Sequence, residues 1–170
     1  IDNPMQDIPL AAVMRSPIVG MSDEEMAWMV AAFKKNSKKG QDRGVYGAWS
    51  MWMEPDSEML QKVPEEAAAS IRKKLSCLSG LLETLRREAG YLPIHELLYR
   101  VYRDSGYYDY VSALPAGETR RGNLDMLVEK AAAYEATSYK GLFHFVRYIE
   151  RLKKFDTDFG EAATAGEQDN

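Results

Sequence analysis

An apolar residue recurs every three or four positions between Pro64 and Gly90, and this spacing predicts one long helix over that stretch. A proline is tolerated in the first turn of a helix, where its missing N–H is not needed, and a glycine commonly ends one. Glu65 and Glu66 complement the helix dipole at the predicted start. A helix of this length needs other elements to cover its apolar side, which consists of Ala68, Ile71, Leu75, Leu78, Leu82 and Leu85.

Helical spacing recurs along the rest of the chain, and no segment alternates convincingly as a half-buried strand does. Asp7 is predicted to cap a first short helix, and Ser22 with Glu25 matches a capping box that starts a second. The 170 residues are enough for one well-buried core but cramped for two domains. The sequence therefore predicts an all-α, irregular multi-helix bundle of about seven or eight helices, with helices near 8–16, 23–35, 45–60, 64–90, 93–106, 118–137 and 140–155, and a tyrosine-rich turn at 107–117.

The acidic net charge of −4 is unevenly distributed. Five of the 26 acidic residues and none of the 22 basic ones lie in 156–170, so residues 1–155 carry a net charge of +1. Residues 34–44 carry five basic residues and one acidic residue with two glycines, which predicts a mobile basic loop. We therefore expect a helical domain over 1–155 and an acidic flexible linker or tail over 156–170.

Motifs for catalysis, nucleotide binding and metal binding are missing from these residues. The single cysteine, Cys77, excludes an internal disulfide and a cysteine-based zinc site, and it fits a reducing, cytoplasmic setting. His95 and His144 fall on different predicted helices, and His95 beside Glu96 is typical of a capping or solvated pair. No apolar run is long enough to cross a bilayer. We expect no catalytic residue, metal site or cofactor within the chain.

The predicted helix at 140–155 carries a cationic stripe, which we define as Lys140, His144, Arg147, Arg151 and Lys154. At 100° per residue these five side chains fall within about 80° of one another, while Leu142, Phe145, Val146, Ile149 and Leu152 gather on the opposite side. Such a row could contact successive DNA phosphates. The alternative is an ordinary solvated surface balanced by acidic residues of a neighbouring helix.

Tyrosine and methionine clusters are ambiguous. Six of the ten tyrosines lie within residues 91–110, where they could stack on bases or, as is commoner, pack between helices. Seven methionines lie in the first 60 residues and are typical of adaptable packing or of a surface that a partner covers.

Three segments resemble the AddA family of helicase–nuclease subunits, which are UvrD-like superfamily 1 DNA helicases. They are IDNPMQDIPLAAVMRSPIVGMSDEEM at the start, LPIHELLYRVYRDSGYYDYVSALPAGETRRGNLDMLVEKAAAYEATSYKGLFHFVRYIERL in the middle and GEQDN at the end. The run ETRRGNLDMLVEKAAAYE also resembles the R-x-x-N-L-x-x-L helix of the wider group. The resemblance covers about 1–33 and 91–155, whereas 34–90 match mainly in being helical.

The resemblance implies that the chain is a segment of a longer protein, corresponding to the helical 2B domain inserted into the second motor domain. The parent would be an ATP-dependent DNA helicase and exonuclease acting in double-strand break repair and recombination, with ATP and Mg in its motor domains. This segment would hydrolyse nothing itself. It would contact duplex DNA, hinge against the motors and help to assemble an AddB-like partner subunit, in the cytoplasm of a bacterium near the nucleoid.

The resemblance also implies a DNA-contacting turn between the first two helices, where related helicases carry a Gly-Ile-Gly hairpin. Residues 15–22 occupy this place, with Arg15, Ser16, Gly20 and Ser22 as candidates, although one glycine stands where the group has two. Backbone N–H groups at the Ser22 helix start are expected to face a phosphate. A helical protein–protein interaction module without DNA contact remains the alternative function, and a free-standing enzyme the third.

Overall fold

The computed structural model describes residues 3, 5–36, 44–53, 63–137 and 141–166. Eight helices and no strand occur within these ranges, which confirms the predicted all-α, multi-helix class. The helices are α1 (Asp7–Arg15), α2 (Asp23–Asn36), α3 (Gly44–Met53), α5 (Glu65–Glu88), α6 (Ile94–Asp104), α7 (Tyr107–Ser112), α8 (Gly117–Glu135) and α9 (Leu142–Gly166).

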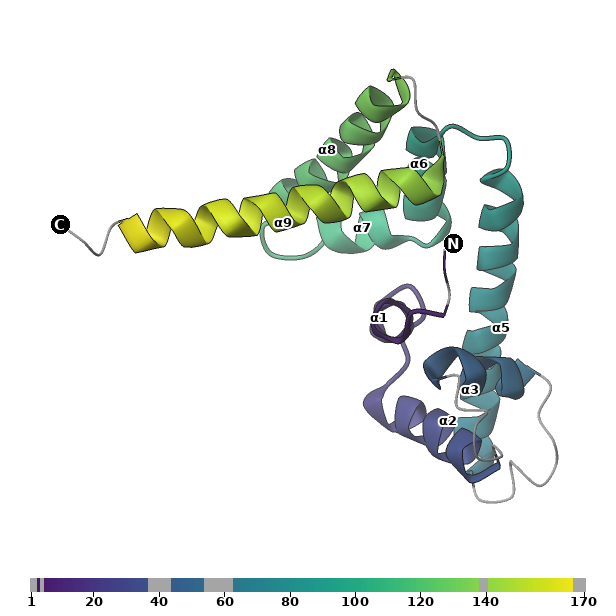
Figure 1. The fold of residues 1–170 in the computed structure, drawn as a ribbon. Helices are drawn as coiled ribbons and strands as arrows, with labels where there is room; N and C mark the ends of the chain where they lie inside the picture. The colour runs from purple at the N-terminus through teal and green to yellow at the C-terminus, as the bar shows by residue number, and fades with distance from the viewer. Residues whose placement is uncertain (1–2, 4, 37–43, 54–62, 138–140, 167–170) are drawn as a thin grey trace.

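The helices form two lobes, and α5 runs along one side of the molecule from the first lobe to the second (Figure 1). The N-terminal lobe contains α1, α2, α3 and most of α5, and the C-terminal lobe contains α6 to α9. Their two apolar cores share no residue. The single core expected from the chain length is therefore divided between the lobes.

The core of the N-terminal lobe is built from the apolar sides of α1, α2, α3 and α5. Trp52 is only 1% exposed, and its indole Nε1 donates a hydrogen bond to the Met29 carbonyl oxygen of α2 at 3.1 Å. Ile71 and Leu75 of α5 are fully buried against this cluster, as their helical spacing predicted. Three methionines of the methionine-rich stretch, Met14, Met21 and Met29, are buried in it, which confirms a packing role for them.

The core of the C-terminal lobe joins α6, α8 and α9. Ile94, Ala131 and Phe145 are buried at its centre. The half-buried apolar residues around them are Leu98, Leu127, Tyr134, Leu142, Tyr148 and Ile149.

Asp7 does not cap the helix that it was predicted to cap. It lies in the first turn of α1, and its carboxylate Oδ1 instead accepts a hydrogen bond from the Val45 N–H at 2.9 Å. Asp7 therefore caps α3. Gly44 has a φ of +58°, and a Cβ at that position would overlap the Asp7 carboxylate. The close approach of α1 to the start of α3 thus requires glycine at this position.

The tyrosine-rich segment predicted as a turn contains a helix, α7. Gly106, with φ of +66°, lets the chain leave α6 and start α7 at once. Tyr102 is buried, and its ring stacks on that of Tyr108 at 6.3 Å between centroids. Packing between helices thus explains these two tyrosines, whereas Tyr91, Tyr99 and Tyr110 are exposed.

Several predicted boundaries differ from the observed ones. Helix α9, predicted to end near Phe155, continues to Gly166, so much of the predicted tail is helical. Residues 167–170 lie outside the described residues, as do 37–43 of the predicted basic loop. Met53 was predicted as an anchor of α3 but is 40% exposed, because Trp49 and Trp52 occupy the buried side.

Candidate nucleic-acid interface

The described part of the cationic stripe lies along the exposed side of α9. His144, Arg147, Arg151 and Lys154 are all exposed, whereas Phe145 on the opposite side is 3% exposed in the core of the C-terminal lobe. The predicted division of this helix into a packed side and a cationic side is therefore confirmed for these residues. Lys140 lies outside the described residues.

The cationic side chains border an open groove of about 630 Å³, which we call the α9 groove. The groove is lined by Tyr134, Phe143, His144, Arg147, Tyr148, Glu150, Arg151 and Lys154. Glu150 is the acidic residue of this set, and its carboxylate lies 3.2 Å from the Arg147 guanidinium. Both side chains are more than half exposed, so this ion pair contributes little to stability. The groove remains a surface with excess positive charge.

Aromatic rings in the α9 groove are the part of the site that the sequence reasoning missed. Phe143 is 48% exposed, and the Arg147 guanidinium carbon lies 5.5 Å from the centre of its ring. The rings of Tyr134 and Tyr148 stack at 5.1 Å between α8 and α9. A phenylalanine at the edge of the polar arc of a helix was the available signal, since Phe143 precedes Arg147 by one helical turn.

The turn at 15–22 uses most of its polar groups internally. The N–H groups of Val19 and Gly20 donate to the Ser16 carbonyl oxygen at 3.1 and 2.7 Å, and that of Met21 donates to the Met14 carbonyl oxygen at 2.9 Å. Arg15 forms an exposed ion pair with Asp23 at 2.6 Å. A phosphate at this turn would have to compete with these contacts.

The capping box at the start of α2 is confirmed, and it also takes the N–H of Ser22 out of play. This N–H donates to Glu25 Oε2 at 2.7 Å, and the Glu25 N–H donates to Ser22 Oγ at 3.1 Å. The expectation that Ser22 presents its own N–H to a phosphate is therefore wrong. The candidate residues of the turn stay a prediction only through Gly20, with φ of +69° and open space around it, and through the side chains of Arg15, Ser16 and Ser22.

Glu25 also joins the turn to α5. Its carboxylate accepts hydrogen bonds from Lys74 Nζ at 2.7 Å and from Ser70 Oγ at 2.6 Å, and Lys74 Nζ donates to the Gly20 carbonyl oxygen at 2.8 Å. Burial by itself would raise the pKa of Glu25, but the hydrogen bonds from Lys74, Ser70 and Ser22 outweigh it and lower the pKa to about 2. The network holds the turn rigidly on α5, which is a structural role.

His95 pairs with a residue that the sequence did not suggest. Its Nδ1 lies 2.5 Å from Glu135 Oε2 at the end of α8, and Glu135 Oε1 accepts a hydrogen bond from the Ile94 N–H at 2.5 Å. Burial would raise the pKa of Glu135, but the hydrogen bonds from His95 and from the N–H groups of residues 94 and 95 lower it. Glu135 thus caps α6 from another helix, and Glu96 is not the partner of His95.

Replacing Glu135 with alanine is expected to lower the free energy of unfolding by about 1–2 kcal/mol, because the start of α6 loses its acceptor. Since folding lowers the pKa of this carboxyl, its contribution is complete above the ordinary value and disappears as the pH falls toward the folded value. Urea unfolding followed by circular dichroism at pH 7 and pH 3 measures both effects. Glu96→Ala, which removes an exposed carboxylate from the same helical turn, is the matched control; an equal loss in both variants would contradict the cap.

The two groups of candidate DNA-contacting residues do not form one site. The turn belongs to the N-terminal lobe and the cationic stripe to the C-terminal lobe, and no residue of 15–22 lines the α9 groove. The start of the N-terminal lobe does reach α9, because Asn3 and Gln6 line a second hollow together with Phe143 and Arg147. Within the described ranges, no three His, Cys, Asp or Glu side chains gather as a metal site would require, and no helix is long and apolar enough to cross a membrane.

The chain is similar over its full length to known bacterial proteins. All 170 residues align at 44% identity with AddA, the ATP-dependent helicase/nuclease protein of Bacillus cereus strain B4264, and the protein of the same name from Bacillus thuringiensis strain Al Hakam is equally similar. The chain spans 13% of the length of these relatives. No family model matches it. The resemblance to AddA is thus confirmed, and it extends through residues 34–90, where helical character alone had been recognised.

Proposed function

We propose that this chain acts as a non-catalytic, DNA-contacting part of an ATP-dependent helicase/nuclease similar to the Bacillus AddA proteins. The full-length similarity at 44% identity is the observation that carries this proposal. ATP and Mg would bind to motor domains of the parent, outside the 13% of the relatives that this chain spans. A 2B-like role, in which the chain contacts the duplex backbone and couples it to the motors, fits a two-lobed bundle with one cationic side.

The α9 groove supports DNA contact better than the turn at 15–22 does. Its cations lie along successive turns of one helix, so they can follow a run of phosphates, whereas the turn's N–H groups and Arg15 already have partners. Contact through point charges does not depend on sequence and weakens as salt is added. We therefore assign the duplex contact to His144, Arg147, Arg151 and Lys154, with Lys140 at the start of the stripe.

The other roles belong to the parent protein. The Bacillus relatives are named as subunits, which supports a complex, and an AddB-like second subunit is the partner we propose. Repair of double-strand breaks in a bacterial cytoplasm, close to the nucleoid, is the setting that we propose for it.

Changing both Arg147 and Arg151 to glutamate is expected to weaken binding of a labelled DNA hairpin at least tenfold at low salt. It should also reduce the slope of log K against log salt by about 2, since two phosphate contacts are lost. Fluorescence anisotropy over a salt series measures both quantities.

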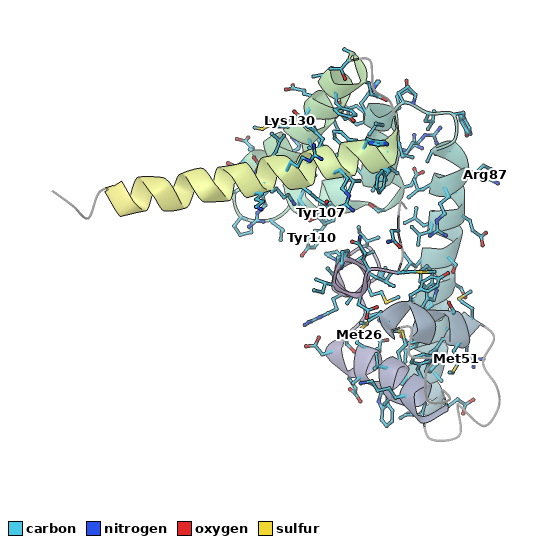
Figure 2. All side chains as sticks on the ribbon, viewed as in Figure 1. Met26, Met51, Arg87, Tyr107, Tyr110 and Lys130 are labelled. Atoms are coloured by element: carbon cyan, nitrogen blue, oxygen red, sulfur yellow. The ribbon has the colours of Figure 1, made fainter. Side chains whose placement is uncertain are left out.

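The matched control for this experiment reverses the charge of two exposed residues on α5, Lys73 and Arg87. Arg87 projects from the side of α5 that faces away from α9 (Figure 2). The control has the same net charge as the Arg147/Arg151 variant, so it should retain binding if the α9 groove is the contact. Equal losses in both variants would reduce the effect to net charge. Unchanged binding in the first variant would remove α9 from the interface, and a protein–protein module without DNA contact would then be the better description.

A further inference from the structure

The α9 groove contains a feature that contact with a duplex backbone does not require. Phe143 exposes 48% of its surface, although an apolar ring gains free energy when it is buried. Its ring is held in place by the Arg147 guanidinium, 5.5 Å from the ring centre, and by the His144 ring, which meets it edge-on at 5.2 Å. Phe143 is therefore a positioned aromatic surface set among cations.

Two further rings line the same groove. Tyr134 of α8 and Tyr148 of α9 stack at 5.1 Å with an angle of 28° between their planes, and Tyr134 also contacts the buried Phe145 ring. These contacts fix the tyrosines to the core of the C-terminal lobe. The groove thus combines cations on its exposed helix with aromatic rings whose positions are set by packing.

This combination suits unpaired nucleotides. In a duplex the bases stack on one another and present only edges in the grooves, so a ring at the protein surface gains nothing from them beyond the phosphate contacts. An unpaired base has both faces open and stacks on an aromatic side chain whatever its sequence. Cations along a groove hold the backbone of the same strand.

We infer that the α9 groove binds a single strand of DNA at a junction with duplex, with Phe143 as the ring on which an unpaired base stacks and Arg151 and Lys154 on the flanking phosphates. This inference rests on the proposed function, because it requires that the groove contacts DNA. It adds that the groove distinguishes unpaired bases from a paired backbone.

The test compares three labelled DNA probes of equal length at one low salt concentration, by fluorescence anisotropy with the full 170-residue chain. The probes are an oligothymidine, the same backbone with abasic sites in place of the bases, and a blunt duplex. The oligothymidine is expected to bind more tightly than the other two. Phe143→Ala should weaken its binding about five- to hundredfold and leave binding of the abasic strand unchanged. Arg151→Gln should weaken binding of both strands, because it removes a phosphate contact.

Tyr91→Ala, which removes a ring that is 69% exposed in the link between α5 and α6, is the control for loss of a surface aromatic residue and should change nothing. Circular dichroism of Phe143→Ala checks that the helix content is retained. If the oligothymidine and the abasic strand bind equally in a salt-dependent way, or if Phe143→Ala does not affect oligothymidine, the inference is wrong and the phosphate contact stands. If no probe shows salt-dependent binding, the proposed function fails as well.

Discussion

Replacing Trp52 with alanine is expected to destabilise the N-terminal lobe by about 3–5 kcal/mol. The indole is 1% exposed at the centre of the core that α1, α2, α3 and α5 share, so its removal leaves a cavity that the surrounding helices fill only in part. The variant also loses the hydrogen bond from Nε1 to the Met29 carbonyl oxygen at 3.1 Å, which leaves a buried acceptor without this donor. A loss of this size is a large fraction of the stability of an ordinary domain.

The tryptophans make this loss measurable by lobe. All three tryptophans, Trp28, Trp49 and Trp52, lie in α2 and α3, so tryptophan fluorescence reports on the N-terminal lobe alone. Because the two cores share no residue, urea should shift the fluorescence midpoint of Trp52→Ala strongly, while the circular dichroism of the C-terminal helices persists to higher urea. Trp28→Phe, at a half-buried position on α2, is the control and should cost less than about 1.5 kcal/mol. A Trp52→Ala midpoint close to that of the control would contradict this account of the core.

Replacing Glu25 with glutamine is expected to cost about 2–3 kcal/mol at pH 7, because the carboxylate is the common acceptor for Lys74, Ser70 and the Ser22 N–H. The carboxylate is 12% exposed, so solvent screens this network only weakly. Without its charge the Lys74 ammonium keeps the Gly20 carbonyl oxygen but loses its anionic partner.

The pH dependence provides a second measurement of the same network. Folding lowers the pKa of Glu25 from 4.5 to about 2, so the carboxylate stabilises the fold fully above pH 4.5 and loses this contribution as the pH falls through 2. The stability difference between the native chain and Glu25→Gln should therefore shrink by about 2–3 kcal/mol between pH 7 and pH 2. Urea unfolding followed by tryptophan fluorescence at several pH values measures it. Glu24→Gln, an exposed neighbour, is the control, and parallel pH profiles for the native chain and Glu25→Gln would rule the network out.

Local signals in the sequence predicted most of the helices. The apolar stripe of α5, the capping box of Ser22 and Glu25, and the breaks at Pro64, Gly90 and Gly106 all act within a few residues, and each is present in the structure. The opposite sides of α9 were also predictable, because helical periodicity decides which residues share a side. The α7 helix was missed since its six residues are too few to show a period.

Contacts between distant residues were not predictable from the sequence. Asp7 caps α3 across 38 positions, Glu135 caps α6 across 41, and Lys74 reaches Glu25 across 49. The residues involved are ordinary polar side chains with suitable local roles, and the sequence-based predictions gave Asp7 and His95 such roles. Which partner a side chain meets depends on how whole helices pack, and a single sequence does not contain that geometry.

For the candidate interface, the sequence by itself determined the row of cations and the apolar side opposite to it, because both follow from the 100° rotation per residue along one helix. Only the tertiary structure decided that Phe143 stays exposed beside Arg147, that Tyr134 of α8 stacks on Tyr148 of α9, and that the donors of the turn at 15–22 are mostly used internally. The physical reason is that a ring is exposed or buried according to what neighbouring helices cover, and that depends on packing rather than on local spacing.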